Sequence, residues 1–267
     1  MQIQTELRQN AIETEQKLQE YLPQSEFETV LRYCLLQGGK RLRPFLVRTV
    51  AKSFGTADEN VWRLACAAEM IHSYSLVHDD LPCMDNDDFR RGRPSCHKAF
   101  GEANAVLAGD ALLNLAFETL LNGQMRRGYR KACAYLASCA GTLGMIAGQV
   151  LDLAPEKPWN AETLQILTER KTAKLIEAAA VAPALYCEAD EATVSLLRQW
   201  AKAFGKAFQI KDDLQDGAEE GKLTFVTLFG ETGAYELLRQ TSEEAIQIAE
   251  ELRLYALREL TEYNRSR

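Results

Sequence analysis

The sequence lacks the marks of a membrane, secreted or zinc-binding protein. It has no run of about 18 consecutive apolar residues, and the N-terminal segment MQIQTELRQNAIETEQ lacks the basic and then apolar layout of a signal peptide. The seven cysteines are odd in number and form neither a CxxC pair nor a Cys/His zinc spacing. These absences predict a soluble, cytoplasmic protein with reduced thiols and no membrane span.

An excess of basic charge is also missing. The chain has 31 lysines and arginines against 38 aspartates and glutamates, a net charge of −7. Because nucleic-acid binding needs a basic surface, we expect no nucleic-acid partner. The negative net charge argues less strongly against the binding of small phosphorylated ligands. With 46% hydrophobic residues, the chain has enough apolar material for a packed core, which excludes a disordered protein.

Alternating strand patterns are almost absent, whereas apolar residues recur at spacings of three and four. We therefore predict an all-α fold, a single domain over residues 1–267 whose long helices, about 30 Å each, surround a deep central cavity. The predicted helices cover residues 3–20, 25–37, 40–54, 58–80, 102–122, 127–151, 160–181, 190–216 and 233–264. Ser25 and Glu28 predict a capping box for the second helix. Ala140, Gly144 and Gly148 recur every four residues, which favours close packing against a neighbour.

The stretch HSYSLVHDDLPCMDNDDFRRGRPSCH, residues 72–97, concentrates charged residues. Three arginines directly follow a first acidic group of five aspartates within ten residues: Asp79, Asp80, Asp85, Asp87 and Asp88. Apolar residues at core spacing precede the group, so the acids lie where a buried helix ends. Pro82 predicts that this helix ends or distorts inside the acidic run.

Clustered carboxylates at the negative end of a helix repel one another unless a cation is present. Mg²⁺ takes oxygen ligands and is typically held by one or two carboxylates together with substrate phosphates. The run lacks the glycine and closing glutamate of a calcium-binding loop. The pattern favours a magnesium site, and an acidic loop with incidental arginines is the alternative.

The segment FQIKDDLQD ends another long helix with a second acidic group, Asp212, Asp213 and Asp216. Asp212 and Asp216 are four residues apart and share a helix face with Gln209. Taken alone, these three aspartates fit a solvent-exposed helix surface as well as they fit a metal site. Two such groups at the ends of long apolar helices together predict several Mg²⁺ ions around one diphosphate.

Cationic residues complete the pattern. The run GGKRLRP places Lys40, Arg41 and Arg43 at the start of a helix, whose free N–H groups favour phosphate. His72 lies two helical turns before Asp79 and is placed to donate a hydrogen bond to a second phosphate group. An ordinary basic turn and a core histidine are the alternatives. Three further polar residues are unremarkable individually and become candidate site residues only together with the acidic groups and the GGKRLRP run: Lys171, Thr172 and Lys222.

In combination, these motifs resemble the short-chain trans-polyprenyl diphosphate synthases, in particular the bacterial farnesyl diphosphate synthase (geranyltranstransferase) type. The resemblance runs through GGKRLRP (38–44), IHSYSLVHDDLPCMDNDDFRRG (71–92), FGEANAVLAGDALL (100–113), GQVLDL (148–153), KT (171–172) and FQIKDDLQD (208–216). It implies a Mg²⁺-dependent, head-to-tail condensation of isopentenyl diphosphate with dimethylallyl or geranyl diphosphate, which gives farnesyl diphosphate and pyrophosphate. It also implies a homodimer.

The resemblance assigns roles to individual residues. The resemblance implies six metal ligands: Asp79, Asp80, Asp85, Asp212, Asp213 and Asp216. It also implies that all of these except Asp216 are catalytic. The residues implied to assist at the allylic diphosphate are Arg90, Lys171, Thr172 and Gln209, and Lys171 is also implied to be catalytic. Those implied to bind isopentenyl diphosphate are Lys40, Arg43, His72 and Arg91, and Gly39 and Lys222 complete the substrate-binding set.

Two features bear on the resemblance. After Asp216 only GAEE precedes GKLT at 221–224, where the family carries a longer segment with an additional Gly-Lys. Tyr74 stands five residues before Asp79, where bulk stops chain growth in the family, and an aromatic residue there implies a fifteen-carbon product. Ser75 lies more directly beneath Asp79 on a helical wheel, so Tyr74 as a plain core residue is the alternative.

Other functions remain as alternatives. A geranylgeranyl or geranyl diphosphate synthase of the same family differs only in product length. A non-catalytic partner subunit of a heteromeric synthase is expected to lose one acidic group, and both are present. A terpene cyclase has no need of the GGKRLRP and RRG segments for a second diphosphate.

Overall fold

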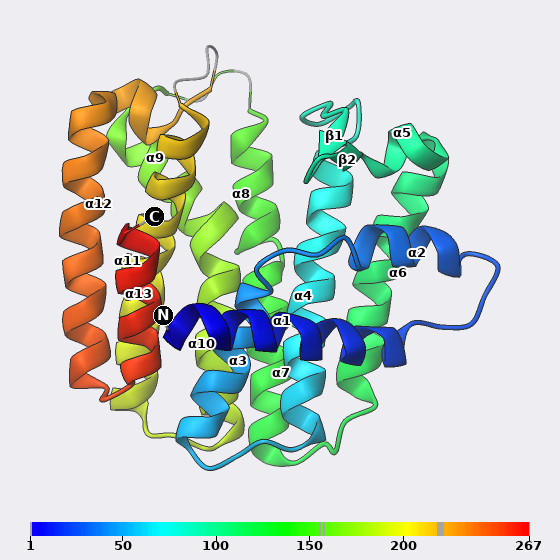
Figure 1. Ribbon diagram of the computed structural model, residues 1–267, viewed down its shortest axis with the longest axis horizontal. Coiled ribbons are helices and arrows are strands. Elements are labelled where there is room, and N and C mark those ends of the chain that lie inside the picture. The colour runs from blue at the N-terminus through cyan, green and yellow to red at the C-terminus, as the bar shows by residue number, and fades with distance from the viewer. Residues whose placement is uncertain (1, 155, 157, 218–221, 267) are drawn as a thin grey trace. The chain divides into compact units, whose positions relative to one another are not determined.

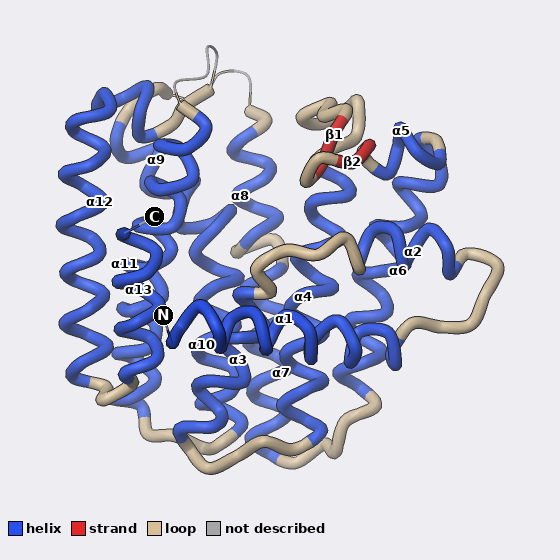
Figure 2. The backbone as a smooth tube through the Cα atoms, in the orientation of Figure 1, coloured by secondary structure: helices blue, strands red, loops and turns tan. Residues whose placement is uncertain are grey.

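The computed structural model describes residues 2–154, 156, 158–217 and 222–266. These residues are almost entirely helical (Figure 2), which confirms the all-α prediction. The two strands found among them, β1 (Phe89–Arg90) and β2 (Arg93–Pro94), form a short antiparallel hairpin. The chain divides into two compact units, one of Met1–Arg48 with Thr56–Arg126, and one of Thr49–Gly55 with Arg127–Arg267.

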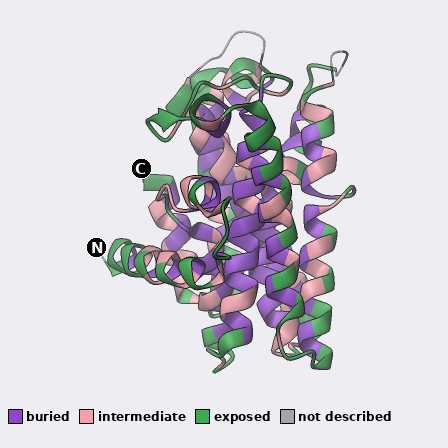
Figure 3. Ribbon diagram, turned by 90° about the vertical axis from the view of Figure 1, so that its right-hand side faces the viewer, coloured by how far each residue is buried: buried purple, intermediate pink, exposed green. Residues whose placement is uncertain are grey.

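The first unit is organised around α4. Its helices are α1 (Gln2–Tyr21), α2 (Glu28–Leu35), the start of α3 (Leu42–Ser53), α4 (Glu59–Asp79), α5 (Cys96–Phe100) and α6 (Glu102–Leu121). The Asp58 side chain caps α4 by accepting a hydrogen bond from the Val61 N–H. The helix is buried along most of its length and packs against α6, whereas α1 is largely exposed (Figure 3).

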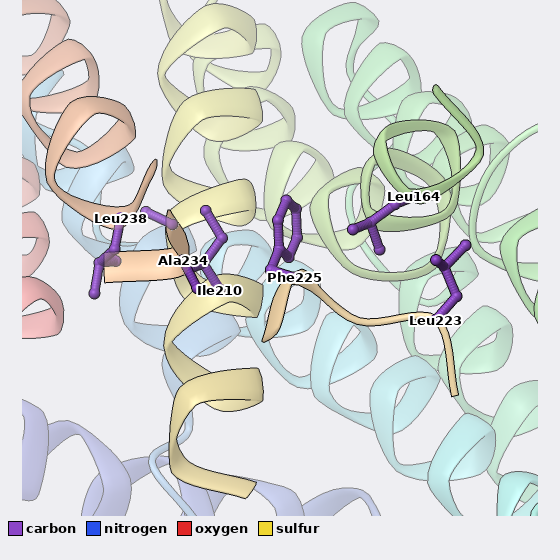
Figure 4. Packing of buried hydrophobic residues seen from close by; sticks show 7 residues of the cluster. Leu164, Ile210, Leu223, Phe225, Ala234 and Leu238 are labelled. Atoms are coloured by element: carbon purple, nitrogen blue, oxygen red, sulfur yellow. The ribbon is translucent and has the colours of Figure 1, made fainter. Parts of the chain in front are cut away.

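The second unit packs long helices against one another. It contains α7 (Arg127–Ala140), α8 (Met145–Asp152), α9 (Ala161–Leu167), a π-helical segment at Thr168–Ala173, α10 (Lys174–Tyr186), α11 (Glu191–Asp216), α12 (Phe225–Glu251) and α13 (Tyr255–Ser266). Helices α11 and α12 lie side by side (Figure 1), and α10 contacts both α7 and α11. One apolar cluster near the start of α12 contains Leu164, Ile210, Leu223, Phe225, Ala234 and Leu238 (Figure 4).

Several predicted helix boundaries are wrong. The capping box at Ser25 and Glu28 is absent, because α2 begins only at Glu28 and its cap residue Phe27 makes no side-chain cap hydrogen bond. The helix predicted at 160–181 runs on to Tyr186 and contains the π-helical segment. Within α12 (Phe225–Glu251) the backbone of Gly230 is non-helical, with φ 70° and ψ 167°, so the helix beyond it begins close to the predicted start at 233. The predicted helix 233–264 is wrong at its other end, because it breaks after Glu251.

The helix predicted at 127–151 is broken between α7 and α8. The backbone of Gly144 is non-helical, with φ −118° and ψ −123°, and a Cβ there would lie 1.8 Å from the Cys139 carbonyl oxygen. Gly148, one turn later, packs directly against the backbone of Lys171. The prediction of close packing is therefore confirmed at Gly148, whereas Gly144 serves the turn.

Two helical stretches of the described chain, Glu102–Leu121 and Arg127–Asp152, are long and apolar enough to cross a membrane. In their most apolar windows, 44% and 39% of the residues are buried within the protein. Core helices of soluble proteins pass the same test, so these two stretches are weak evidence for a membrane span. All seven cysteines lie among the described residues as free thiols.

Candidate functional site

The first acidic group lies where α4 ends. The helix stops at Asp79, as Pro82 predicts, and the Asp85 N–H then donates a 2.9 Å hydrogen bond to the Asp79 carbonyl oxygen. This bond returns the chain to the helix end, so Asp79 and Asp85 come together. Asp79 is 8% exposed and Asp80 only 2%, whereas Asp85 is exposed.

Asp80 is paired with an arginine of the hairpin. Arg90 donates from Nε to Asp80 Oδ1 at 2.9 Å and from a second nitrogen to the same oxygen, and it also reaches Asp87 at 3.2 Å. Burial raises the pKa of Asp80, and the hydrogen bond and charge of Arg90 oppose this rise. The predicted substrate-binding residue Arg90 is therefore held at the acidic group by a half-buried ion pair.

The GGKRLRP turn is in contact with the hairpin. Arg91 donates a hydrogen bond to the Gly38 carbonyl oxygen, and its guanidinium lies so close to Gly39 that a Cβ there would be 2.8 Å from Cζ. Gly39 has a φ of 117°, a backbone conformation that favours glycine. Lys40 is exposed. Three predicted site residues from distant motifs, Gly39, Lys40 and Arg91, are thus brought together.

Arg41 is distinct from its neighbours, because it is fully buried. It donates to Glu69 at 2.8 Å, to Glu15 at 3.0 Å and to the Leu35 carbonyl oxygen at 2.8 Å. Arg41 therefore stabilises the fold beneath the turn and does not present its charge to a ligand.

His72 lies among arginines and is partly buried. Burial lowers its pKa well below the usual value, and the charges of Arg43 and Arg91 lower it further. The imidazole is therefore neutral at pH 7 and retains one N–H donor.

A small pocket beside α4 brings Arg90 and Arg91 together with Asp80. Its remaining lining residues, none of them predicted, are Cys34, Gln37, Ser73, Leu76, Val77 and Cys96. Ser73 lies seven residues, or two helical turns, before Asp80 on the same helix face, so helical position was a usable signal, whereas Gln37 carried none.

Tyr74 is buried in the core, and its ring packs edge-to-face on His78 with ring centroids 5.9 Å apart. His78 Nε2 lies 3.0 Å from the Val106 carbonyl oxygen, and the His78 ring occupies the space where Gly109 has no side chain. Burial raises the pKa of Tyr74 to about 12, and its hydroxyl has no hydrogen-bond partner among the described residues. The hydroxyl of Ser75 donates to the His72 carbonyl oxygen at 2.9 Å.

In the second unit, Lys171 and Thr172 lie in the π-helical segment, a local geometry common at functional sites. Lys171 forms an ion pair with Asp152 of α8 at 2.6 Å. A Cβ on Gly148 would lie 2.3 Å from the backbone nitrogen of Lys171, so the close approach of α8 to the π-helical segment depends on glycine at this position. Asp152 belongs to the GQVLDL motif, but its ion pair with Lys171 was not predicted.

A hydrogen-bonded chain connects this segment to the second acidic group. Thr172 donates to Gln209 Oε1 at 2.6 Å, and Gln209 Nε2 donates to Asp213 Oδ1 at 2.9 Å. Gln209 was expected on the face of Asp212 and Asp216 but bonds instead to Asp213. Sequence reasoning also missed Phe225, whose N–H donates to Asp213 Oδ2 at 2.7 Å.

The segment after the second acidic group is only partly described. Residues 218–221, most of the shortened stretch and the first glycine of GKLT, lie outside the described residues. Asp216 and Lys222 are exposed, and the Lys222 carbonyl oxygen accepts a 3.0 Å hydrogen bond from the Thr227 hydroxyl.

Among the described residues, no three acidic, histidine or cysteine side chains converge to form a complete metal-binding group. Mg²⁺ does not require one, because one or two carboxylates commonly hold it together with water and substrate phosphates. The hydrogen bond at the end of α4 brings the backbones of Asp79 and Asp85 together, and both residues carry carboxylate oxygens, the ligand type Mg²⁺ prefers. The residues present therefore fit this ion.

Comparisons with known proteins identify the family of the chain. The model of the polyprenyl synthetase family matches residues 24–224. Farnesyl diphosphate synthase of Bacillus subtilis is 44% identical over 206 residues, which cover 74% of this chain and 69% of that protein. A chloroplastic geranylgeranyl pyrophosphate synthase of Catharanthus roseus is 41% identical over 243 residues, which cover 88% of this chain and 68% of that protein. The chain thus spans about two thirds of the length of these curated relatives.

Solved structures extend the similarity over nearly the whole chain. The apo crystal structure of an FPP/GFPP synthase from Zymomonas mobilis has a TM-score of 0.91 and 36% sequence identity, with 98% of each chain covered. A geranyltransferase from Legionella pneumophila has a TM-score of 0.88 and 34% identity, covering 99% of this chain and 98% of that one. The chain therefore belongs to the polyprenyl synthetase family, in its short-chain trans-prenyltransferase branch.

Proposed function

We propose that the chain is a Mg²⁺-dependent farnesyl diphosphate synthase. It condenses isopentenyl diphosphate with dimethylallyl or geranyl diphosphate, head to tail, and releases pyrophosphate. The observation that carries the proposal is the end of α4, where aspartates, Arg90 and Arg91 meet the GGKRLRP turn. Carboxylates for a metal and cations for diphosphate within one small region suit a reaction whose leaving group is an anion.

The chemistry follows from these residue types. The C–O bond to the allylic diphosphate breaks and leaves an allylic carbocation, which the double bond of isopentenyl diphosphate attacks to form the new C–C bond. The adduct then loses a proton to the released diphosphate, so no protein base is needed. Arg90 and Lys171 stabilise the negative charge that develops on the leaving group.

Substrate binding is divided between two sets of residues. Arg90, Lys171, Thr172 and Gln209 bind the allylic diphosphate. Gly39, Lys40, Arg43, His72 and Arg91 bind isopentenyl diphosphate, and Lys222 assists. Because His72 is neutral, it serves as a hydrogen-bond donor and not as a charge.

Mg²⁺, when bound, neutralises the charge of the diphosphate and so makes it a better leaving group. Its proposed ligands come from the first acidic group, Asp79, Asp80 and Asp85, and from the second, Asp212, Asp213 and Asp216. Each group supplies only oxygen donors, in keeping with this ion.

Similar proteins are named both farnesyl diphosphate synthase and geranylgeranyl pyrophosphate synthase, so the product length needs an argument of its own. We assign a fifteen-carbon product because the buried Tyr74 ring is held against His78 near the start of the acidic group. A geranylgeranyl or geranyl diphosphate synthase is the second candidate. A non-catalytic partner subunit is disfavoured, because both acidic groups are complete.

The test incubates the purified protein with Mg²⁺, isopentenyl diphosphate and geranyl diphosphate. Diphosphate release is measured, and the dephosphorylated products are separated by chromatography. We expect farnesyl diphosphate from the wild type and none from Asp79→Ala. No elongation by the wild type contradicts the proposed activity, whereas a longer product contradicts only the chain-length assignment.

Replacing the bulk at Tyr74 tests the chain-length assignment directly. We expect Tyr74→Ala to extend the product by at least one five-carbon unit, because the ring no longer blocks growth. The matched control is Ser75→Ala, which removes only a hydroxyl bonded within the helix and leaves the product unchanged. If Tyr74→Ala gives the same product as the wild type, Tyr74 does not set the chain length and is an ordinary core residue.

A single domain, a homodimer and cytoplasmic localisation stay predictions from the sequence. Light scattering on the purified protein measures the oligomer directly, and a monomer that is active contradicts the predicted dimer.

A further inference from the structure

Two cysteines lie side by side at the small pocket beside α4. Cys34 belongs to α2 and Cys96 is the first residue of α5, and both line the pocket together with Asp80, Arg90 and Arg91. A hydrogen bond joins the two thiol side chains. The fold therefore brings together two reduced thiols that are distant in the sequence.

The contacts around the pair hold α2 against α5 (Figure 1). The Tyr33 hydroxyl donates a 2.6 Å hydrogen bond to the Pro94 carbonyl oxygen. The Tyr33 ring also packs edge-to-face on Phe100, with ring centroids 5.0 Å apart. These contacts come from the residue next to Cys34 and from both sides of Cys96 in the sequence, so the two thiols are held at one place in the fold.

The two thiols differ in access and in acidity. Cys34 is partly exposed, whereas Cys96 is only 4% exposed. The hydrogen bond from Cys34 lowers the pKa of Cys96, and the same bond together with burial raises the pKa of Cys34. Cys96 is thus the readier thiolate, and the partly exposed Cys34 is the neighbouring thiol beside it. A thiolate next to a second cysteine is the arrangement typical of cysteines that small oxidants modify.

We propose that Cys34 and Cys96 form a modification site, which a peroxide oxidises to a disulfide, and that this disulfide slows the reaction at the neighbouring pocket. The Cys96 thiolate attacks a peroxide oxygen, the O–O bond breaks, and a Cys96 sulfenic acid and a hydroxide form. The Cys34 sulfur then attacks the Cys96 sulfur, the S–O bond breaks, and the S–S bond forms. The two released hydroxides take up the two thiol protons, so the thiols lose two electrons and one hydrogen peroxide becomes two waters.

The disulfide affects the pocket because it joins two segments that meet there. Bonded sulfurs lie about 2 Å apart, closer than hydrogen-bonded ones, so the bond draws the two segments together. Cys34 lies just before the turn at Gly38, whose carbonyl oxygen accepts the hydrogen bond of Arg91. Cys96 lies just after the hairpin that carries Arg90 and Arg91. Because a displacement of about 1 Å at a substrate-positioning group costs about 100-fold in rate, we expect the disulfide to slow elongation by about tenfold or more.

The modification site rests on the positions of the two thiols alone, whereas the loss of elongation rests on the proposed function. Two measurements therefore test them separately.

Thiol mapping tests the modification site. The reduced, full-length protein is treated with hydrogen peroxide, which catalase then removes. Free thiols are titrated in denaturant, and peptides digested without reductant are mapped by mass spectrometry. We expect the wild type to lose two of its seven thiols and to yield peptides linked through Cys34 and Cys96, which dithiothreitol separates. Oxidation confined to other cysteines, or oxidation of this pair without a bridge, overturns the proposal.

Three variants serve as controls. Cys34→Ser and, independently, Cys96→Ala each remove one partner, so neither protein can form the bridge. The matched control is Cys83→Ser, which removes an exposed thiol that lies between α4 and the hairpin and leaves the pair intact. Circular dichroism of the reduced variants verifies that each one folds.

Elongation assays test the effect on the pocket. The rate of each oxidised protein is divided by the rate of the same protein after treatment with dithiothreitol, so differences in basal activity cancel. We expect this ratio to fall to about one tenth in the wild type and in Cys83→Ser, and to stay near one in Cys34→Ser and Cys96→Ala. A bridged wild type that elongates at the full rate overturns the effect on the pocket, as does an equal loss in Cys34→Ser. A reduced wild type that does not elongate refutes the proposed function, and the thiol mapping then decides the modification site by itself.

Discussion

Replacing Gly148 by alanine tests whether the position of Lys171 depends on the close approach of α8. The added Cβ would lie 2.3 Å from the backbone nitrogen of Lys171 and 2.5 Å from the Lys171 Cα, whereas ordinary van der Waals contact begins at 3.4 Å. Both are backbone atoms and cannot rotate away. Helix α8 and the π-helical segment must therefore separate by about 1 Å.

This separation has two costs of different size. Overpacking a well-packed contact costs about 1–3 kcal/mol, and the higher helix propensity of alanine returns up to about 1 kcal/mol. We therefore expect a net loss of about 1–2 kcal/mol in unfolding free energy. A displacement of about 1 Å at a substrate-positioning group costs about 100-fold in rate, equivalent to about 2.7 kcal/mol of transition-state stabilisation.

Steady-state kinetics and urea unfolding of Gly148→Ala measure the two costs. The matched control is Gly141→Ala, whose Cβ would lie 3.3 Å from the Ala137 carbonyl oxygen and far less tightly against its surroundings. We expect the control to keep kcat/KM within threefold and Gly148→Ala to lose about 100-fold. A Gly148→Ala enzyme with wild-type kcat/KM refutes the reasoning, because Lys171 would then tolerate the displacement.

Three further predictions concern the first unit and the acidic groups. Glu69→Gln lowers the unfolding free energy by about 1.5–3 kcal/mol in urea titrations, because it removes the more buried of the two carboxylates that pair with Arg41, while Glu15 still pairs with it; a loss below 1 kcal/mol contradicts this. Because folding lowers the pKa of His72, its contribution to stability is complete above the unfolded pKa of about 6.5 and is lost as the pH falls below it. Unfolding at pH 7.5 and pH 5 measures this loss, which His72→Asn should reduce. Asp79→Ala and Asp212→Ala abolish elongation while circular dichroism stays unchanged, and near-full activity in either variant refutes the metal assignment.

The parts of the fold that local chemistry determines were predictable. Proline cannot continue a helix, so Pro82 correctly predicts the end of α4 at Asp79. The two-residue strands of the hairpin were not predictable, because so short a segment has no periodicity to read. The π-helical segment at Thr168–Ala173 packs against Gly148, which lies on another helix, and no local pattern indicates this contact.

The same distinction holds for the candidate site. The motif GGKRLRP shows three cations in four residues, but only burial separates Arg41 from Lys40. The partner that buries Arg41 is Glu69, 28 residues later in the chain, and nothing local indicates the pair. In the same way, the hydrogen bond from Gln209 to Asp213 was missed, because a helical wheel shows which face a residue occupies and not which atoms it meets.

The two acidic groups share one arrangement at their pairs of neighbouring aspartates. Neighbouring side chains on a helix point about 100° apart, so the two carboxylates of a pair meet different surroundings. In the first group Asp80 is bonded to Arg90, and in the second Asp213 is bonded to Gln209 and the Phe225 N–H. The bond to Arg90 ties the end of α4 to the hairpin, and the bond to the Phe225 N–H ties the end of α11 to the start of α12. The second aspartate of each pair is thus held by groups that lie outside its own helix, which no local pattern in the sequence indicates.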